Sequence, residues 1–113
     1  MVKNGRAGIR YENSANGALF ENNEVHGNGA NERRGGIDIR DSQHAVVKNN
    51  NFGPETIAGA SYLANGDKIG VRATDSGRTD RVNLSNISVV DNTMDGDRIV
   101  SCGGPVSCGN NSP

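Results

Sequence analysis

Two aspartates occupy equivalent positions in similar segments of the chain. Asp41 lies in residues 36–42, Gly-Ile-Asp-Ile-Arg-Asp-Ser, and Asp75 lies in residues 70–76, Gly-Val-Arg-Ala-Thr-Asp-Ser. If the segments stack as neighbouring strands, the carboxyls lie one strand spacing, ~4.8 Å, apart, near the ~5 Å of a retaining glycosidase pair. Repulsion between them would raise one pKa and provide a general acid. Residues 8–14 carry Asn13 at this position, so a turn-forming role also explains all three residues.

Charged residues alternate with apolar ones ahead of these aspartates and predict two outward rows. The rows are Arg10, Asp38 and Arg72, and Glu12, Arg40 and Thr74. Such charged rows could supply a base that abstracts a proton and positive charge that stabilises the resulting anion. The candidate catalytic residues are Asp38, Arg40, Asp41 and Asp75, and the candidate ligand-binding residues are Arg10, Glu12 and Arg72. The alternative is opposite-charge pairing between strands, Arg10–Asp38–Arg72 and Glu12–Arg40.

Metal and cofactor signals are weak. His26 and His44 are the only histidines, and we expect exposed turn residues, since no spacing makes them converge with carboxylates. Residues 91–97, Asp-Asn-Thr-Met-Asp-Gly-Asp, form an acidic cluster that could hold surface calcium. The cluster lacks the ligand spacing and the closing glutamate of a calcium-binding hand. We therefore expect no metal site and no cofactor, with calcium as the alternative.

The net charge and the hydropathy of the chain limit the kinds of partner that we expect. The 113 residues carry a formal net charge of −1, with 12 basic and 13 acidic residues interspersed. This balance gives no electrostatic reason to expect nucleic acid. No run of 18 apolar residues is present, so no membrane partner is expected either.

The strongest signal is an internal repeat, which positions all of these side chains. Residues 8–14, 36–42 and 70–76 align without gaps and alternate apolar and polar residues, the period of a half-buried strand. The predicted inward columns are Ile9, Ile37 and Val71, and Tyr11, Ile39 and Ala73. A fourth copy is predicted at 98–102, because Ile99 follows Val71 by the same 28 residues that separate Gly8 from Gly36.

A second motif follows each strand, at residues 20–25, 47–52 and 89–94. Apolar residues lie three before and two after a fixed asparagine, namely Asn23, Asn50 and Asn92. This spacing suits a chain that bends at the asparagine, so that both apolar neighbours face one core. We expect the three amides to stack as a hydrogen-bonded ladder, as in cross-β arrays. Ordinary exposed turn asparagines are the alternative.

Composition and period together predict the fold. Glycine and asparagine each number 16, and valine plus isoleucine number 17 against 3 leucines. Beta-branched residues favour strands, and repeat steps of 28 and 34 residues suit an all-β solenoid, a parallel β-helix of about four coils. Extra residues are expected in loops at 28–34, at 76–85 and at 53–68, the last including a third strand.

These residues resemble the repeats of the right-handed parallel β-helices of the pectate-lyase-like superfamily, over about residues 5–102. The matching forms are Gly-Ile-x-Ile-x-Asp-Ser and Val-x-x-Asn-x-Phe, as in mannuronan C5-epimerases and other secreted bacterial β-helix proteins. The resemblance implies a right-handed β-helix and an extracellular or cell-surface location. In this superfamily, active sites lie along one outer sheet, and pectate lyases use an arginine base. The epimerase signature Asp-Pro-His-Glu is absent here.

The C-terminal segment 102–113 is predicted to be a cap and tail. Cys102 and Cys108 flank Gly-Gly-Pro-Val-Ser, which favours a disulfide, with two reduced thiols as the alternative. No cap precedes the first coil, so we expect either the C-terminal part of a longer solenoid or self-association through the N-terminal coil.

Three functions remain open. The first is a non-catalytic extracellular module that binds polysaccharide or serves as surface structure. The second is the C-terminal fragment of a lyase, epimerase or hydrolase acting on uronan-type glycans. The third is a segment of a phage tailspike or fibre. Fold analogy alone cannot choose among them.

Overall fold

The structure, a computed structural model, describes residues 8–26, 35–53, 69–94, 98–100 and 102–113. This part contains strands and turns, and it holds no helix that is long and apolar enough to cross a bilayer. The strands are β1 (Ile9–Glu12), β2 (Ala18–Glu21), β3 (Glu24–Val25), β4 (Ile37–Arg40), β5 (Ala45–Lys48), β6 (Asn51–Phe52), β7 (Ile69–Thr74), β8 (Ile87–Val90), β9 (Arg98–Val100) and β10 (Val106–Gly109).

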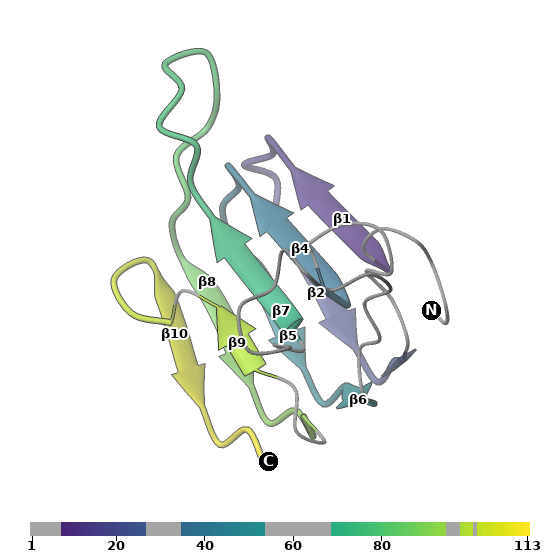
Figure 1. The fold of residues 1–113 in the computed structure, drawn as a ribbon. Coiled ribbons are helices and arrows are strands. Elements are labelled where there is room, and N and C mark those ends of the chain that lie inside the picture. Colours follow the sequence, from purple (N-terminus) through teal and green to yellow (C-terminus); the bar gives the residue numbers. More distant parts are fainter. Residues whose placement is uncertain (1–7, 27–34, 54–68, 95–97, 101) are drawn as a thin grey trace, which may run out of the picture.

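The strands form three sheets in which every pairing between named strands is parallel. Their orders are β1-β4-β7-β9, β10-β8-β5-β2 and β3-β6. Figure 1 shows β1, β4 and β7 side by side with their arrows in one direction. Neighbours in each sheet come from successive runs of the chain, which we call passes 1 to 4 (residues 8–26, 35–53, 69–94 and 98–113). The prediction of an all-β chain with parallel sheets is confirmed.

The strand register agrees with the sequence alignment. Ile9, Ile37 and Val71 are paired in one column, and Ile99 continues it from pass 4. The isoleucines of pass 2 and Val71 are fully buried, so these columns face the core. One outward residue departs from the prediction: Asp38 lies in the expected row but is only 1% exposed. The burial is local to this position, because Arg40 on the same face of β4 has a side chain that is 35% exposed, and strand alternation does not reveal it.

The chain bends between the second and third sheets as the asparagine motif predicts. Val25, Phe52 and Met94, each two residues after a fixed asparagine, are buried in the same core as the other two sheets. The residue ahead of each asparagine has a left-handed backbone; these residues are Asn22, Asn49 and Asp91, with φ of 59°, 54° and 58°. Asn and Asp tolerate this conformation better than most side chains, which explains their use at the bend.

The predicted loops are only partly within the described residues. Two predicted features lie outside the described residues: the loop at 28–34, and the third strand expected within 53–68, of which only Gly53 is described. The predicted extension after β7 is present, and Figure 1 shows it projecting beyond the ends of β1 and β4. We call residues 75–84 the strap.

Candidate functional site

The strap folds back across the turns of passes 1 and 2. The Val82 N–H donates to Asn13 Oδ1 over 3.0 Å, and the Gln43 amide donates to the Asn83 carbonyl over 3.1 Å. Arg81 places a guanidinium nitrogen 2.6 Å from Glu12 and 3.7 Å from Asp41. The strap therefore joins three passes at the edge where the candidate catalytic residues lie.

Asp41 is a fully buried acceptor within this edge. Its Oδ1 accepts the Ser76 N–H over 2.7 Å, and its Oδ2 accepts the Ser76 hydroxyl over 2.9 Å. Burial alone would raise the pKa of Asp41, but the Ser76 hydrogen bonds and the charges of Arg40 and Arg81 outweigh it, so the pKa is lowered. The pKa of Asp41 is thus shifted in the direction opposite to the one that a general acid requires.

Asp75 is exposed and has a different set of partners. Its Oδ1 accepts the Gly77 N–H over 2.8 Å, and its Oδ2 accepts the Leu84 N–H over 2.9 Å. It thereby closes the strap at both ends. Asp41 and Asp75 follow adjacent strands as predicted, and both oxygens of each carboxylate accept hydrogen bonds. The turn-forming alternative accounts for the contacts of Asp75 and for the left-handed backbone of Asp41, with φ of 51°. The Ser76 bonds of Asp41 instead join passes 2 and 3.

The outward rows carry ion pairs that differ from the predicted set. Arg10 lies 2.7 Å from Glu12 on its own strand and 3.8 Å from Asp38 on β4, as the first row predicts. Glu12 pairs with Arg10 and Arg81, while the ion pair of Arg40 is with Asp41 at 3.8 Å. The predicted Glu12–Arg40 pair is therefore not formed as a direct contact, because the strap delivers Arg81 to Glu12.

Electrostatics reinforce this arrangement at Glu12. Burial opposes ionisation of Glu12, but the Arg81 hydrogen bond and the charges of Arg10, Arg81 and Arg40 lower its pKa. Arg72 completes the first row, in register with Asp38, and is partly buried. Sequence reasoning missed Arg81, which lies 69 residues from Glu12 in an irregular segment with no repeat signal.

The predicted asparagine ladder is present inside the fold. The Nδ2 of Asn23 donates to Asn50 Oδ1 over 3.0 Å, and the Nδ2 of Asn50 donates to Asn92 Oδ1 over 3.0 Å. Each of these acceptors also receives the backbone N–H of the preceding ladder residue. Asn50 and Asn92 are 2% and 1% exposed, so the alternative of exposed turn asparagines is wrong for them.

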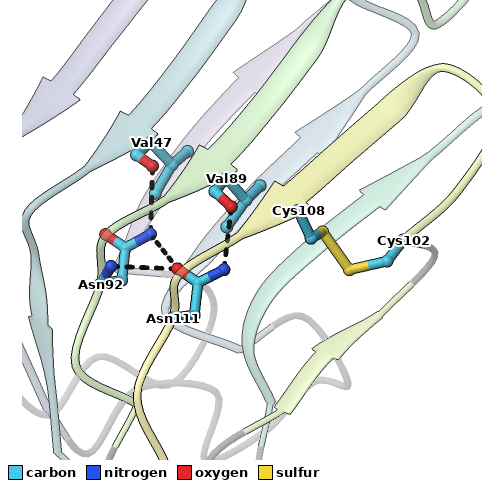
Figure 2. Close-up of a disulfide and its surroundings, with 6 residues drawn as sticks. All are labelled: Val47, Val89, Asn92, Cys102, Cys108 and Asn111. Carbon is cyan, nitrogen blue, oxygen red and sulfur yellow. Dashed lines mark hydrogen bonds between the residues drawn. A yellow bond between two sulfur atoms is a disulfide. The ribbon is translucent and has the colours of Figure 1, made fainter.

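A fourth ladder residue was not predicted. The Nδ2 of Asn92 donates to Asn111 Oδ1 over 2.9 Å and to the Val47 carbonyl over 3.1 Å, as Figure 2 shows. Asn111 donates in turn to the Val89 carbonyl over 2.9 Å. The segment 102–113, predicted as cap and tail, thus contains β10 and a complete bend. The signal was available, because Cys108 lies three residues before Asn111, as Val89 lies before Asn92.

The predicted disulfide joins Cys102 to Cys108 in pass 4. Cys108 is in register with Val89 and so occupies an inward column (Figure 2), yet it is exposed. Between the cysteines, Gly103 and Val106 exchange N–H to carbonyl bonds of 2.8 and 3.0 Å. The disulfide and this hairpin together close the turn between β9 and β10.

The histidines serve as local hydrogen-bonding groups. His26 Nε2 lies 2.8 Å from Glu24 Oε2, and the ring is half-buried above Gly53 rather than exposed as expected. His44 is exposed, and its Nδ1 lies 2.7 Å from the Asn86 amide. The described part of the chain holds no group of three metal-ligating side chains, and Asp95 and Asp97 of the acidic cluster lie outside it.

No family model, curated protein or solved structure matches this chain. Function is therefore inferred from the chain's own contacts.

Proposed function

We propose that the chain is a right-handed parallel β-helix of about four coils, a member of the pectate-lyase-like superfamily, in which each pass is one coil. In support, equivalent residues of successive passes are in register in two sheets. Apolar residues from all three sheets share one core. Crossovers between parallel strands are nearly always right-handed, which favours that hand here.

We propose further that this β-helix is a non-catalytic extracellular module. The observation that carries this proposal is Asp41, whose two oxygens both accept hydrogen bonds from Ser76. A general acid must hold a proton near neutral pH, and the lowered pKa of Asp41 opposes this. The Cys102–Cys108 disulfide suits an oxidising, extracellular compartment. No cofactor is proposed.

The proposed ligand is a polysaccharide of the uronan type, bound on the outer face of the β1-β4-β7-β9 sheet. Arg10, Arg40 and Arg81 gather there with side chains 33%, 35% and 25% exposed. A guanidinium binds a carboxylate through paired N–H donors. The 3.8 Å separation of Arg40 from Asp41 is longer than a charge-assisted hydrogen bond, so Arg40 retains donors for a sugar carboxylate.

Affinity electrophoresis in gels containing alginate or pectate tests the binding. We expect the wild-type protein to be retarded and Arg40→Gln to lose most of the retardation. Arg78→Gln is the matched control, because Arg78 is on the strap and pairs with Asp80 at 3.0 Å. It removes the same charge, and its retardation relative to a gel without glycan should equal that of the wild type. If glycan leaves the mobility of each of the three proteins unchanged, this binding face is excluded.

Incubation with the same glycans tests the absence of catalysis. Lyase activity would produce an unsaturated sugar that absorbs in the ultraviolet, and epimerisation would change the NMR spectrum of the glycan. We expect neither change. Product that disappears in Arg40→Ala or Asp75→Ala would overturn the non-catalytic proposal and favour the fragment of a carbohydrate-active enzyme.

A further inference from the structure

The asparagine ladder has a direction. In each step the backbone N–H and the Nδ2 group of one asparagine donate to the Oδ1 of the asparagine in the next pass. Among the described residues, no group donates to Asn23 Oδ1 at the start of the ladder. At the other end, the backbone N–H of Asn111 and one hydrogen of its Nδ2 have no acceptor in the same part of the chain. The ladder thus begins with an acceptor and ends with donors.

The two edge strands of the second sheet, β2 and β10, likewise expose backbone groups that could bond to each other between copies. Ala18 and Asn22 donate their N–H groups toward pass 2. Because backbone groups alternate sides along a strand, the N–H and carbonyl of Glu21 face the open edge of β2. At the other end, Ile87 and Asp91 donate to pass 4, so the backbone groups of Cys108 face the open edge of β10.

The edge strand β2 also carries an exposed apolar side chain. Leu19 is 60% exposed and is the exposed large hydrophobic residue of the described chain. It lies in register with Val46, which is partly buried between neighbouring passes. Among the described strands β2 is at the edge of its sheet, and a strand edge that carries an apolar side chain is a template for pairing with another strand.

We propose that a second copy of this chain docks head to tail, with pass 4 of one molecule on pass 1 of the next. In this arrangement the N–H and Nδ2 of Asn111 donate to Asn23 Oδ1 of the next copy, which continues the ladder. The Glu21 N–H donates to the Cys108 carbonyl across the junction, and Leu19 packs over Ser107. The surface is heterologous, so repeated docking gives open chains rather than closed dimers.

The Gly103–Val106 hairpin limits this junction. Its two hydrogen bonds occupy the edge-facing N–H and carbonyl groups of Val106. These two groups therefore cannot bond to the second copy. Hydrogen bonding across the junction is then confined to the stretch from Cys108 to Asn111. Association should accordingly be reversible and dependent on concentration.

Sedimentation velocity over a concentration series tests the proposal. We expect an apparent mass that rises above the 11.8 kDa monomer as concentration increases. Glu21→Pro removes the edge N–H, and Glu21→Ala is the matched control that removes the side chain and keeps the N–H. Proline is tolerated at an edge where the N–H is unused, so Glu21→Pro should fold and remain monomeric, while Glu21→Ala associates. If Glu21→Pro does not fold, amide exchange at Glu21 in the wild type gives the same answer, with protection that increases with concentration.

The polarity is tested by mixing two blocked variants. Asn111→Asp places a carboxylate against Asn23 Oδ1 and blocks the other end. Glu21→Pro and Asn111→Asp should each be monomeric alone, and an equimolar mixture should form a heterodimer through the two intact ends. A wild-type protein that is monomeric at every concentration would overturn the proposal. Self-association of Asn111→Asp, a monomeric mixture, or loss of association in Glu21→Ala would each overturn it as well.

Discussion

Replacement of Asn92 by leucine removes the centre of the asparagine ladder while retaining a side chain of similar size. Asn92 Oδ1 accepts the backbone N–H of Asn50 over 2.9 Å and its Nδ2 over 3.0 Å. Its own Nδ2 donates to Val47 and Asn111 over 3.1 and 2.9 Å. The substitution therefore removes four hydrogen bonds from a side chain that is 1% exposed.

The largest expected penalty is the buried N–H of Asn50, which loses its acceptor. An unsatisfied buried donor costs about 1–3 kcal/mol, and each net hydrogen bond lost adds roughly 0.5–1.5 kcal/mol. Some of the freed groups keep a second partner, since Asn50 Nδ2 still donates to Phe20 over 2.8 Å. We therefore expect Asn92→Leu to lower the free energy of unfolding by about 2–4 kcal/mol. For a domain of this size the melting temperature would fall by roughly 10–20 °C.

Thermal and urea denaturation followed by circular dichroism measure this loss, with Asn23→Leu as the matched control. Asn23 is at the end of the ladder, is half-buried and donates one side-chain hydrogen bond. Its substitution should cost about 0.5–1.5 kcal/mol. Equal effects of the two substitutions, or a neutral Asn92→Leu, would refute the view that the ladder stabilises the core.

Three further predictions concern the turns and the edge. The disulfide joins Cys102 and Cys108, six residues apart. Its reduction, or serine substitution of both cysteines, should lower the free energy of unfolding by about 2 kcal/mol. Urea denaturation with and without reductant measures this loss. The pKa of Asp41 is lowered in the folded protein, so the ionised carboxylate stabilises the fold fully above the unfolded pKa of about 3.9, and this stabilisation is lost as the pH falls through the folded pKa. Asp41→Asn should remove this acid-dependent loss of stability in thermal melts at successive pH values. A pH profile equal to that of the wild type would contradict the assignment. Gly35→Ala would place a Cβ 2.1 Å from a backbone carbonyl oxygen, whereas Gly77→Ala, with nearly the same φ (74° against 75°), meets open space. Melting temperatures should therefore fall much further for Gly35→Ala than for Gly77→Ala, and comparable shifts would show that backbone conformation rather than close packing governs both sites.

The strands and the ladder were predictable because each follows from a short local rule. Alternation of apolar and polar residues identified Ile37 and Ile39 as inward, and the register with Val71 followed from a gapless alignment. Asn23, Asn50 and Asn92 were found because apolar residues flank each of them at fixed spacing. Asn111 obeys the same rule, but the residue three before it is Cys108 and not the aliphatic or aromatic residue found in the other three copies.

The site was harder to predict because it depends on an irregular segment. The strap contains no repeat, so nothing in the sequence indicated that Arg81 would contact Glu12 or that Ser76 would donate hydrogen bonds to Asp41. The burial of Asp38 was missed for a related reason. Alternation along a strand distinguishes the two faces of a sheet, but the exposure of one outward side chain also depends on its neighbours on adjacent strands, which for Asp38 include Arg10 at 3.8 Å.

We infer that the carboxylates at the strap edge stabilise the fold rather than carry out acid–base chemistry. Carbon-13 NMR titration of the Asp41 carboxyl distinguishes these two roles. The hydrogen bonds from Ser76 and the charges of Arg40 and Arg81 predict a pKa below the usual value for aspartate, about 3.9. A carboxyl that titrates near neutral pH would contradict the account and identify Asp41 as a general acid.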